Sequence, residues 1–229
     1  LKNVKMPSIL GSEIVVFSGK NGTGKTKLME EMANIDSKIF TREKGLQIAY
    51  MPQFWPEEIM DGSLEDFFQW VKGGINPHSE RSMRRFLGEL RDIGFKHDDK
   101  NLSNKLFKSF SGGEQRLLWF VATSILEGTD VLILDEPSNH MDSDTMQQIV
   151  NVIRQFPGAI ILSTHELRLM KELEKDPGGL RQGIGVKNVV FERSPQTESI
   201  SLNISKEGPF EYASQVIEKA RKSGGRVKV

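Results

Sequence analysis

The sequence has 229 residues, of which 37% are hydrophobic, and this length allows one domain or two closely packed lobes with a sizeable core. Its 31 Lys and Arg residues balance 31 Asp and Glu residues, so the formal net charge of +0 gives no overall attraction to nucleic acid or to a membrane surface. The lack of cysteine excludes disulfides and cysteine–metal sites. We find no apolar run of bilayer length and no signal peptide, and we therefore expect a cytoplasmic protein without direct membrane insertion.

A glycine-rich loop joins the first predicted strand, at residues 13–17, to a helix that begins at Lys25. The loop fits G-x-x-x-x-G-K-[ST] at each fixed position and consists of Gly19, Lys20, Asn21, Gly22, Thr23, Gly24, Lys25 and Thr26. Glycines let the backbone approach a polyphosphate, and N–H groups and the positive end of the helix then face its oxygens. Lys25 is placed to reach the β and γ phosphates, and Thr26 to bind Mg²⁺. The loop predicts binding of a nucleoside triphosphate; the alternative is a strand-to-helix turn without a ligand.

The next part of the chain changes from strand to helix. Residues 46–51 predict a second core strand, and Gln53 follows in a loop. Residues 82–93 carry apolar side chains at helical spacing and predict an amphipathic helix. Successive helices inside a chain that starts and ends with strands predict a helical lobe at 61–127. The single domain then divides into this lobe and an α/β core lobe, with the core made of residues 1–60 and 128–229.

One helix of this lobe has a recognisable beginning. Ser63 and Asp66 resemble a capping box, with Asp in place of the usual Glu. We expect Gly73, Gly74 and Pro77 to break that helix.

The second half of the chain predicts alternating strands and helices. Its predicted strands, the last two forming a hairpin, are 131–134, 159–162, 189–191 and 200–204. The predicted helices are 144–156 and 212–222. The tail 219–229 contains five basic residues and no acidic one, and we expect a solvated end, with RNA contact as the alternative.

Two acidic residues follow the apolar run 131–134. Asp135 stands where a phosphate-loop enzyme places a second Mg²⁺ contact, usually through water. Glu136 could polarise a water for attack on the γ-phosphate. An ordinary turn at a strand end is the alternative, but the position 110 residues after Lys25 (135 − 25) favours the functional interpretation.

A second anion site is predicted around residues 111–115. Ser111 can cap the helix that follows, and Gly112 and Gly113 leave its first turn bare. One nucleotide cannot easily occupy two such helix ends in one subunit, so a partner is implied. The alternative is a plain loop ahead of a helix.

Taken together, these motifs resemble those of ABC-type ATPases, in the family's order and across nearly the whole chain. The matching segments are Walker A at 19–26, the Q-loop glutamine Gln53, the signature at 111–115, Walker B at 132–136, the D-loop at 138–142 and the switch histidine His165. The resemblance implies a P-loop NTPase fold with an ABC-type α/β core, a mixed sheet flanked by helices, and an inserted helical lobe that carries the signature.

The resemblance also implies a mechanism. Two cassettes stack head to tail, and each ATP lies between the Walker A of one and the signature of the other. Glu136 is then the base, His165 contacts the γ-phosphate, and Gln53 touches Mg²⁺ and the attacking water. The implied Mg²⁺ contacts are Thr26, Gln53 and Asp135, and the implied signature contacts to ATP are Ser111, Gly112, Gly113 and Gln115.

Within this family, the segment 134–142 (LDEPSNHMD) is similar to the L-D-E-P-T-N-H-L-D of the ABC-F group of soluble ribosome-associated ATPases. The segments 87–95 and 208–212 are also similar to that group. Several features depart from it: Glu rather than Asp follows His165, Phe110 replaces Leu, and Lys5 and Met6 stand where an aromatic usually stacks on adenine. The spacing between the Q-loop and the signature also leaves no room for an arm insertion.

Three functions remain open on the sequence. The first is an ABC-F-like ATPase acting on a ribosome, paired with a second copy or with a missing half of the same polypeptide. The second is the ATPase subunit of a membrane transporter, docked on a transmembrane subunit through the Gln53 loop and the helical lobe. The third is an ATP-gated clamp with little turnover, against which the intact Glu136 argues.

Overall fold

The computed structural model describes a large part of the chain: residues 13–34, 36–37, 40, 45–95, 101–126, 128–139, 141–175, 186–193 and 200–222, with the backbone alone at 193 and 219–222. Expectations about Lys5, Met6, the D-loop's His140 and the end of the basic tail fall outside these residues.

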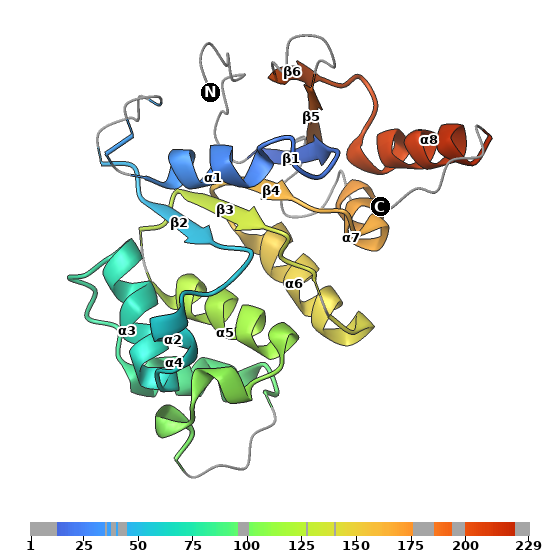
Figure 1. The fold of residues 1–229 in the computed structure, drawn as a ribbon. Coiled ribbons are helices and arrows are strands. Elements are labelled where there is room, and N and C mark those ends of the chain that lie inside the picture. The colour runs from blue at the N-terminus through green and yellow to red at the C-terminus, as the bar shows by residue number, and fades with distance from the viewer. Residues whose placement is uncertain are drawn as a thin grey trace.

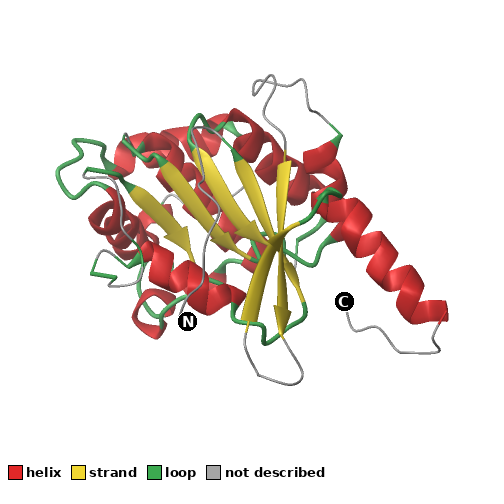
Figure 2. Cartoon of the chain, turned by 90° about the horizontal axis from the view of Figure 1, so that it is seen from above, coloured by secondary structure: helices red, strands yellow, loops and turns green. Residues whose placement is uncertain are grey.

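A six-stranded sheet forms the centre of the molecule (Figure 1). The strand order is β2-β3-β4-β1-β5-β6. Adjacent strands run parallel, except for the antiparallel pair β5–β6. The strands are β1 (Ile14–Gly19), β2 (Ile48–Met51), β3 (Val131–Asp135), β4 (Ala159–Ser163), β5 (Val186–Arg193) and β6 (Ile200–Ile204). The mixed sheet and the final hairpin are confirmed, and Figure 2 shows the strands side by side with helices around them.

Successive residues of β1 point to opposite faces of the sheet, and each face has its own apolar cluster. Val15 and Phe17 pack with α1 (Lys25–Ala33) on one face. Ile14 and Val16 belong to the cluster on the other face, which also contains buried residues of α5 (Gly112–Ile125), α6 (Ser143–Gln155) and α7 (Leu167–Glu174). This two-sided burial explains why the parallel strands are continuous apolar runs. The last helix, α8 (Pro209–Lys222), contacts β1, β5 and α7.

The helices between β2 and β3 lie together below the sheet in Figure 1. They are α2 (Glu57–Met60), α3 (Leu64–Ile75), α4 (Met83–Asp92), the short 3₁₀ turns η1 (Leu102–Asn104) and η2 (Phe107–Ser109), and α5. The apolar cluster that contains Ile14 and Val16 extends into these helices and includes buried aromatic rings of α3 and η2, of which Phe67 and Phe107 stack at 4.2 Å between ring centroids.

The course of α3 corrects one expectation. Gly73 and Gly74 do not break the helix, which continues to Ile75 and has Asn76 as its C-cap, before Pro77. A helical glycine costs about 1 kcal/mol relative to alanine, and burial of Ile75 at the end of the helix offsets this cost. The beginning of α3 is as predicted, because Ser63 and Asp66 form both hydrogen bonds of a capping box.

Within the part of the chain that the structure describes, every helix is too short or too polar to cross a bilayer.

Candidate functional site

The phosphate loop lies between the end of β1 and the beginning of α1. Gly19 and Gly24 have φ angles of 130° and 89°, in the region that favours glycine. A Cβ at Gly19 would also lie 2.5 Å from the carbonyl oxygen of Phe191. Lys20, Asn21 and Gly22 are exposed at the rim of the loop, whereas Thr23 is buried and donates its hydroxyl to the Lys20 carbonyl at 2.8 Å. The loop therefore has the bare, curved backbone that the sequence predicts.

Lys25 lies inside this loop rather than in solvent. Its Nζ donates to the carbonyl oxygens of Gly19 at 2.8 Å and Lys20 at 3.1 Å. Burial lowers the pKa of Lys25, while the charges of Glu136 and Asp135 act in the opposite direction. The ammonium group therefore faces two carboxylates that follow it by more than 100 residues in sequence.

The arrangement of the sheet explains why Lys25 lies near Asp135 and Glu136. Strands β1, β3 and β4 are neighbours or next neighbours and run parallel, so their carboxyl ends reach the same edge. Lys25 follows β1, Asp135 ends β3, and His165 follows β4. Four predicted residues, Lys25, Asp135, Glu136 and His165, are thus brought together.

Asp135 is buried and only partly satisfied. Its Oδ1 accepts a hydrogen bond of 2.5 Å from Ser163 Oγ, while its Oδ2 is buried and has no hydrogen-bond partner. A buried carboxylate oxygen without a partner is costly unless water or a cation meets it. Thr26, the second residue of α1, is half-buried beside Lys25. Among the described residues no cluster of three His, Cys, Asp or Glu side chains could hold a metal by itself.

Glu136 and His165 are in direct contact. The backbone N–H of His165 donates to Glu136 Oε2 at 3.2 Å, and His165 Nε2 lies 3.4 Å from Glu136 Oε1 without meeting hydrogen-bond geometry. Burial, assisted by the charge of Asp135, raises the pKa of Glu136, and the His165 N–H, Lys25 and Arg116 oppose this rise. Burial and the charge of Lys25 lower the pKa of His165. Burial therefore disfavours the charged form of both side chains, the carboxylate of Glu136 and the imidazolium of His165.

Gln53 lies in the loop after β2 and is half-buried. Its carbonyl oxygen accepts a hydrogen bond of 3.0 Å from Nη2 of Arg116, a buried residue of α5. Neither Arg116 nor Ser163 is predicted as a site residue from the sequence. Arg116 follows the signature directly and Ser163 precedes the Thr164–His165 pair, so their proximity to motifs is the signal that could have singled them out.

The signature residues form the beginning of α5, below the sheet (Figure 1). Ser111 is exposed, and it makes a capping box with Glu114: Ser111 N–H donates to Glu114 Oε2 at 2.7 Å, and Glu114 N–H donates to Ser111 Oγ at 3.3 Å. Gly112 is exposed and Gly113 is buried. Gln115 points inward, and its amide donates to two carbonyl oxygens of the preceding loop, those of Phe107 and Phe110.

Comparison with known proteins gives the context of this geometry. A family model described as ABC transporter matches residues 1–139. The probable ATP-binding protein YheS of Haemophilus influenzae is 29% identical over 175 residues, covering 75% of this chain and 26% of the relative. The energy-dependent translational throttle protein EttA of Escherichia coli K12 is 28% identical over 199 residues, covering 72% of this chain and 36% of the relative. The chain therefore spans about a quarter to a third of the length of these curated relatives.

A solved structure shares the fold. The dimeric ATP-binding cassette MJ0796, bound to ADP and phosphate after hydrolysis, superposes with a TM-score of 0.58 at 16% identity, covering 83% of this chain and 85% of that one. At this identity the likeness concerns the fold alone.

Proposed function

The chain belongs to the ABC transporter family, whose cassettes bind and hydrolyse ATP and dimerise, and from that premise we propose that it is an ABC-F-like cassette. In this proposal it hydrolyses ATP at a head-to-tail dimer interface and acts on the ribosome in the cytoplasm. Residues 61–127 form its helical lobe, and 1–60 with 128–229 form its core lobe.

The proposed chemistry uses the groups that meet at the carboxyl edge of the sheet. Lys25 binds the β and γ phosphates, and the N–H groups of residues 20–26 surround them. Glu136 accepts the proton of a water that attacks the γ-phosphate, and burial, which raises its pKa, makes it a stronger proton acceptor than an exposed glutamate. His165 holds Glu136 by its backbone N–H and presents a neutral imidazole to the γ-phosphate.

The residues present fit Mg²⁺. The unpartnered Oδ2 of Asp135, the half-buried Thr26 and Gln53, whose loop follows β2 beside the end of β3, would hold it, with ATP oxygens and waters as the other ligands. When bound, the ion neutralises charge that develops on the phosphate oxygens. For Gln115 we propose support of the signature loop, since its amide is engaged with the carbonyls of that loop. Ser111, Gly112 and Gly113 would contact the ATP of the second cassette.

The observation that carries the ABC-F assignment is the segment 134–142, LDEPSNHMD, together with similarity to EttA and YheS over about three quarters of the chain. EttA is described as a translational throttle protein, and we extend a role in translation to this chain on that basis. The partner cassette is a second copy or another half of a tandem protein.

Cosedimentation with ribosomes tests this function. A Glu136→Gln variant with Mg-ATP should enter the ribosomal pellet, because blocked hydrolysis keeps the closed state, and the same protein without nucleotide should not. Glu166→Gln is the matched control, since Glu166 also lies beside His165 but uses its carboxylate on the backbone N–H of Arg168 at 3.2 Å. If nucleotide has no effect on sedimentation, the ribosomal target is refuted.

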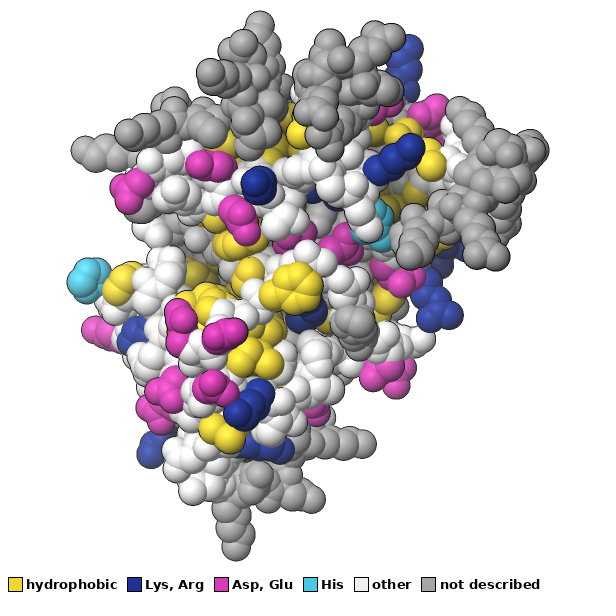
Figure 3. All heavy atoms as spheres, viewed as in Figure 1, with side chains coloured by type: hydrophobic (Ala, Val, Ile, Leu, Met, Phe, Trp, Pro, Cys, Tyr) yellow, Lys and Arg dark blue, Asp and Glu magenta, His cyan; other side chains and the backbone are white. Residues whose placement is uncertain are grey.

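The alternative is an ATPase subunit docked on a transmembrane partner, and one observation favours it. Phe54, directly after Gln53, is 79% exposed. Figure 3 shows hydrophobic side chains gathered below the sheet, with acidic side chains around them. Phe54→Ser should leave ribosome binding unchanged under the first function, whereas under the alternative it should abolish stimulation of ATPase activity by the membrane protein.

A further inference from the structure

Arg116 connects two segments that lie more than 50 residues apart in the chain, the signature helix and the loop of Gln53. It lies on α5, five positions after Ser111, and its side chain is buried. Its Nη2 donates to the Gln53 carbonyl at 3.0 Å, and its Nη1 lies 3.3 Å from Met51 Sδ. One guanidinium therefore joins the first turns of the signature helix to the end of β2 and the loop that follows it.

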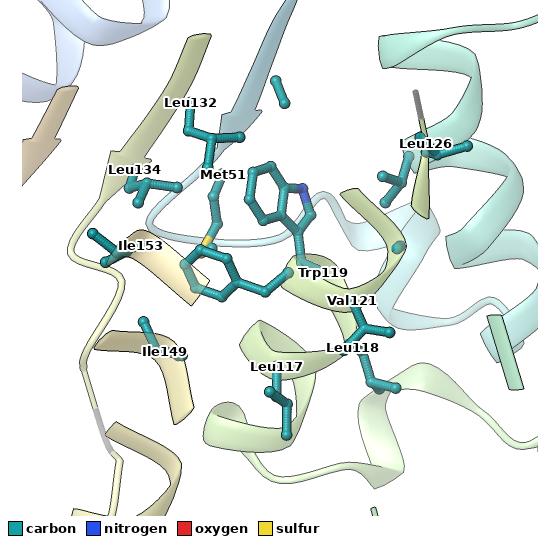
Figure 4. Packing of buried hydrophobic residues seen from close by; sticks show 14 of the residues in the cluster. Met51, Leu117, Leu118, Trp119, Val121, Leu126, Leu132, Leu134, Ile149 and Ile153 are labelled. Carbon is teal, nitrogen blue, oxygen red and sulfur yellow. The ribbon is translucent and has the colours of Figure 1, made fainter. Parts of the chain in front are cut away.

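The buried surroundings of Arg116 restrict movement of its hydrogen bond to Gln53. A buried cation needs hydrogen-bond partners, and the planar guanidinium fixes the directions of its donors. Met51 is fully buried, and Figure 4 shows it among Leu132 and Trp119 in the core between β3 and α5. In such a packed core, neither end of the connection can shift without moving the other.

The other side of the first turn of α5 faces the loop before it. Gln115, next to Arg116, donates to the carbonyls of Phe107 and Phe110, so this loop and the helix move as a unit. The capping box at Ser111 keeps the helix regular to its first residue. A displacement at Ser111 is therefore carried to Arg116 little more than one turn away.

We propose that Arg116 is a positioning residue that couples contact between the signature and the partner cassette's nucleotide to the placement of Gln53. This inference rests on the proposed function, because it requires two cassettes that pair around ATP. In this proposal Arg116 acts through its hydrogen bond to the Gln53 main chain. Its charge also lowers the pKa of Glu136, and the Glu136→Gln background of the exchange experiment below removes that effect.

Amide hydrogen exchange in the Glu136→Gln protein tests the coupling directly. With Arg116 present, Mg-ATP should slow exchange at residues 111–118 and also at 53–55. In an added Arg116→Met variant, whose side chain keeps an apolar stem without donors, 111–118 should stay protected while 53–55 exchange as they do without nucleotide. Arg116→Lys, which keeps the charge and a donor, should restore part of the protection.

Arg154→Met is the matched control. Arg154 is half-buried, whereas Arg116 is buried, and it likewise donates Nη2 to a carbonyl oxygen, that of Glu172 at 2.7 Å, but it joins α6 to α7. In this variant Mg-ATP should slow amide exchange at 111–118 and at 53–55 as much as in the Glu136→Gln protein. With Glu136 intact, Arg116→Met should lower kcat about tenfold or more with a much smaller change in KM, as expected for a misplaced catalytic group.

The outcomes are distinct. Full protection of 53–55 in Arg116→Met overturns the coupling, and so does loss of protection in both segments, which would mark a general structural role. Where Arg116→Met does not fold, Arg116→Lys and Arg116→Gln make the same comparison. If Mg-ATP fails to protect 111–118 even with Arg116 present, pairing of two copies in the proposed function is refuted instead.

Discussion

Glu136→Gln is the sharpest perturbation of the proposed site because it removes a charge and little else. The amide has the shape of the carboxyl group, and its oxygen can still accept the 3.2 Å hydrogen bond from the His165 N–H. The electrostatic attraction between Glu136 and Lys25 is lost, but that between Asp135 and the ammonium group remains. We therefore expect the variant to fold and to bind ATP.

The expected loss of turnover follows from the proposed role of Glu136 as base. General base catalysis contributes about 10²–10⁴-fold, which corresponds to about 2.7–5.4 kcal/mol of transition-state stabilisation. The same substitution should leave the stability of the fold unchanged or raise it. Because burial and Asp135 raise the pKa of Glu136 in the fold, the folded state binds its proton more tightly than the unfolded state. Stability from this group is therefore lost as pH rises through the folded pKa, and the neutral amide removes that loss.

Steady-state ATP hydrolysis, nucleotide binding and thermal unfolding at neutral pH check these three expectations together. Turnover should fall by the stated factor, ATP should drive the variant into a dimer on size-exclusion chromatography with light scattering, and the unfolding temperature should equal or exceed that of the wild type. Glu166→Gln should retain turnover. A Glu136→Gln protein with near wild-type turnover would refute the assignment of the base.

Three further predictions concern the signature, the pH profile and the sheet. Ser111→Arg should keep ATP binding and abolish turnover, because the larger side chain blocks the partner's nucleotide. Ser63→Ala, at the other capping box, should cost about 1 kcal/mol of stability and leave turnover intact. Nucleotide-binding, ATPase and denaturation assays separate the two variants. The kcat should fall on the acid side at a pH above that expected for a free Glu, because catalysis needs the carboxylate of Glu136 and burial raises its pKa; a pH–rate profile without that shift would contradict the electrostatics. Gly158→Ala should destabilise the fold by about 1–3 kcal/mol, since the new Cβ would lie 2.0 Å from the Asp130 carbonyl oxygen, and urea unfolding measures this.

Local pattern was enough to predict the sheet and the phosphate loop. Both depend on short stretches whose meaning does not need the rest of the chain: apolar runs for parallel strands, and glycines at fixed spacing before Lys25. The capping boxes at Ser63 and Ser111 are equally local, since their two partners are three residues apart.

The errors and omissions concern long-range contacts. The glycines at 73 and 74 were expected to end α3, but the aromatic core that holds this helix comes partly from η2, more than 30 residues later. The hydrogen bond between Arg116 and Gln53 joins residues 63 positions apart, and that between Ser163 and Asp135 spans 28. No spacing rule predicts such pairs, because the first depends on α5 packing against the end of β2 and the second on β3 pairing with β4.

The backbone at Glu136 adds an argument for function that the motif alone does not provide. Among the described residues it is the only non-glycine with a positive φ, 51°, and it directly precedes Pro137. A side chain in this left-handed region costs about 1 kcal/mol or more, a cost that glycine would avoid. The Glu136 N–H is held by the Ser163 carbonyl at 3.1 Å, so β4 fixes the conformation. That conformation turns the carboxylate toward His165, and glutamate at a position where glycine would be more stable is best explained by the use of its carboxylate.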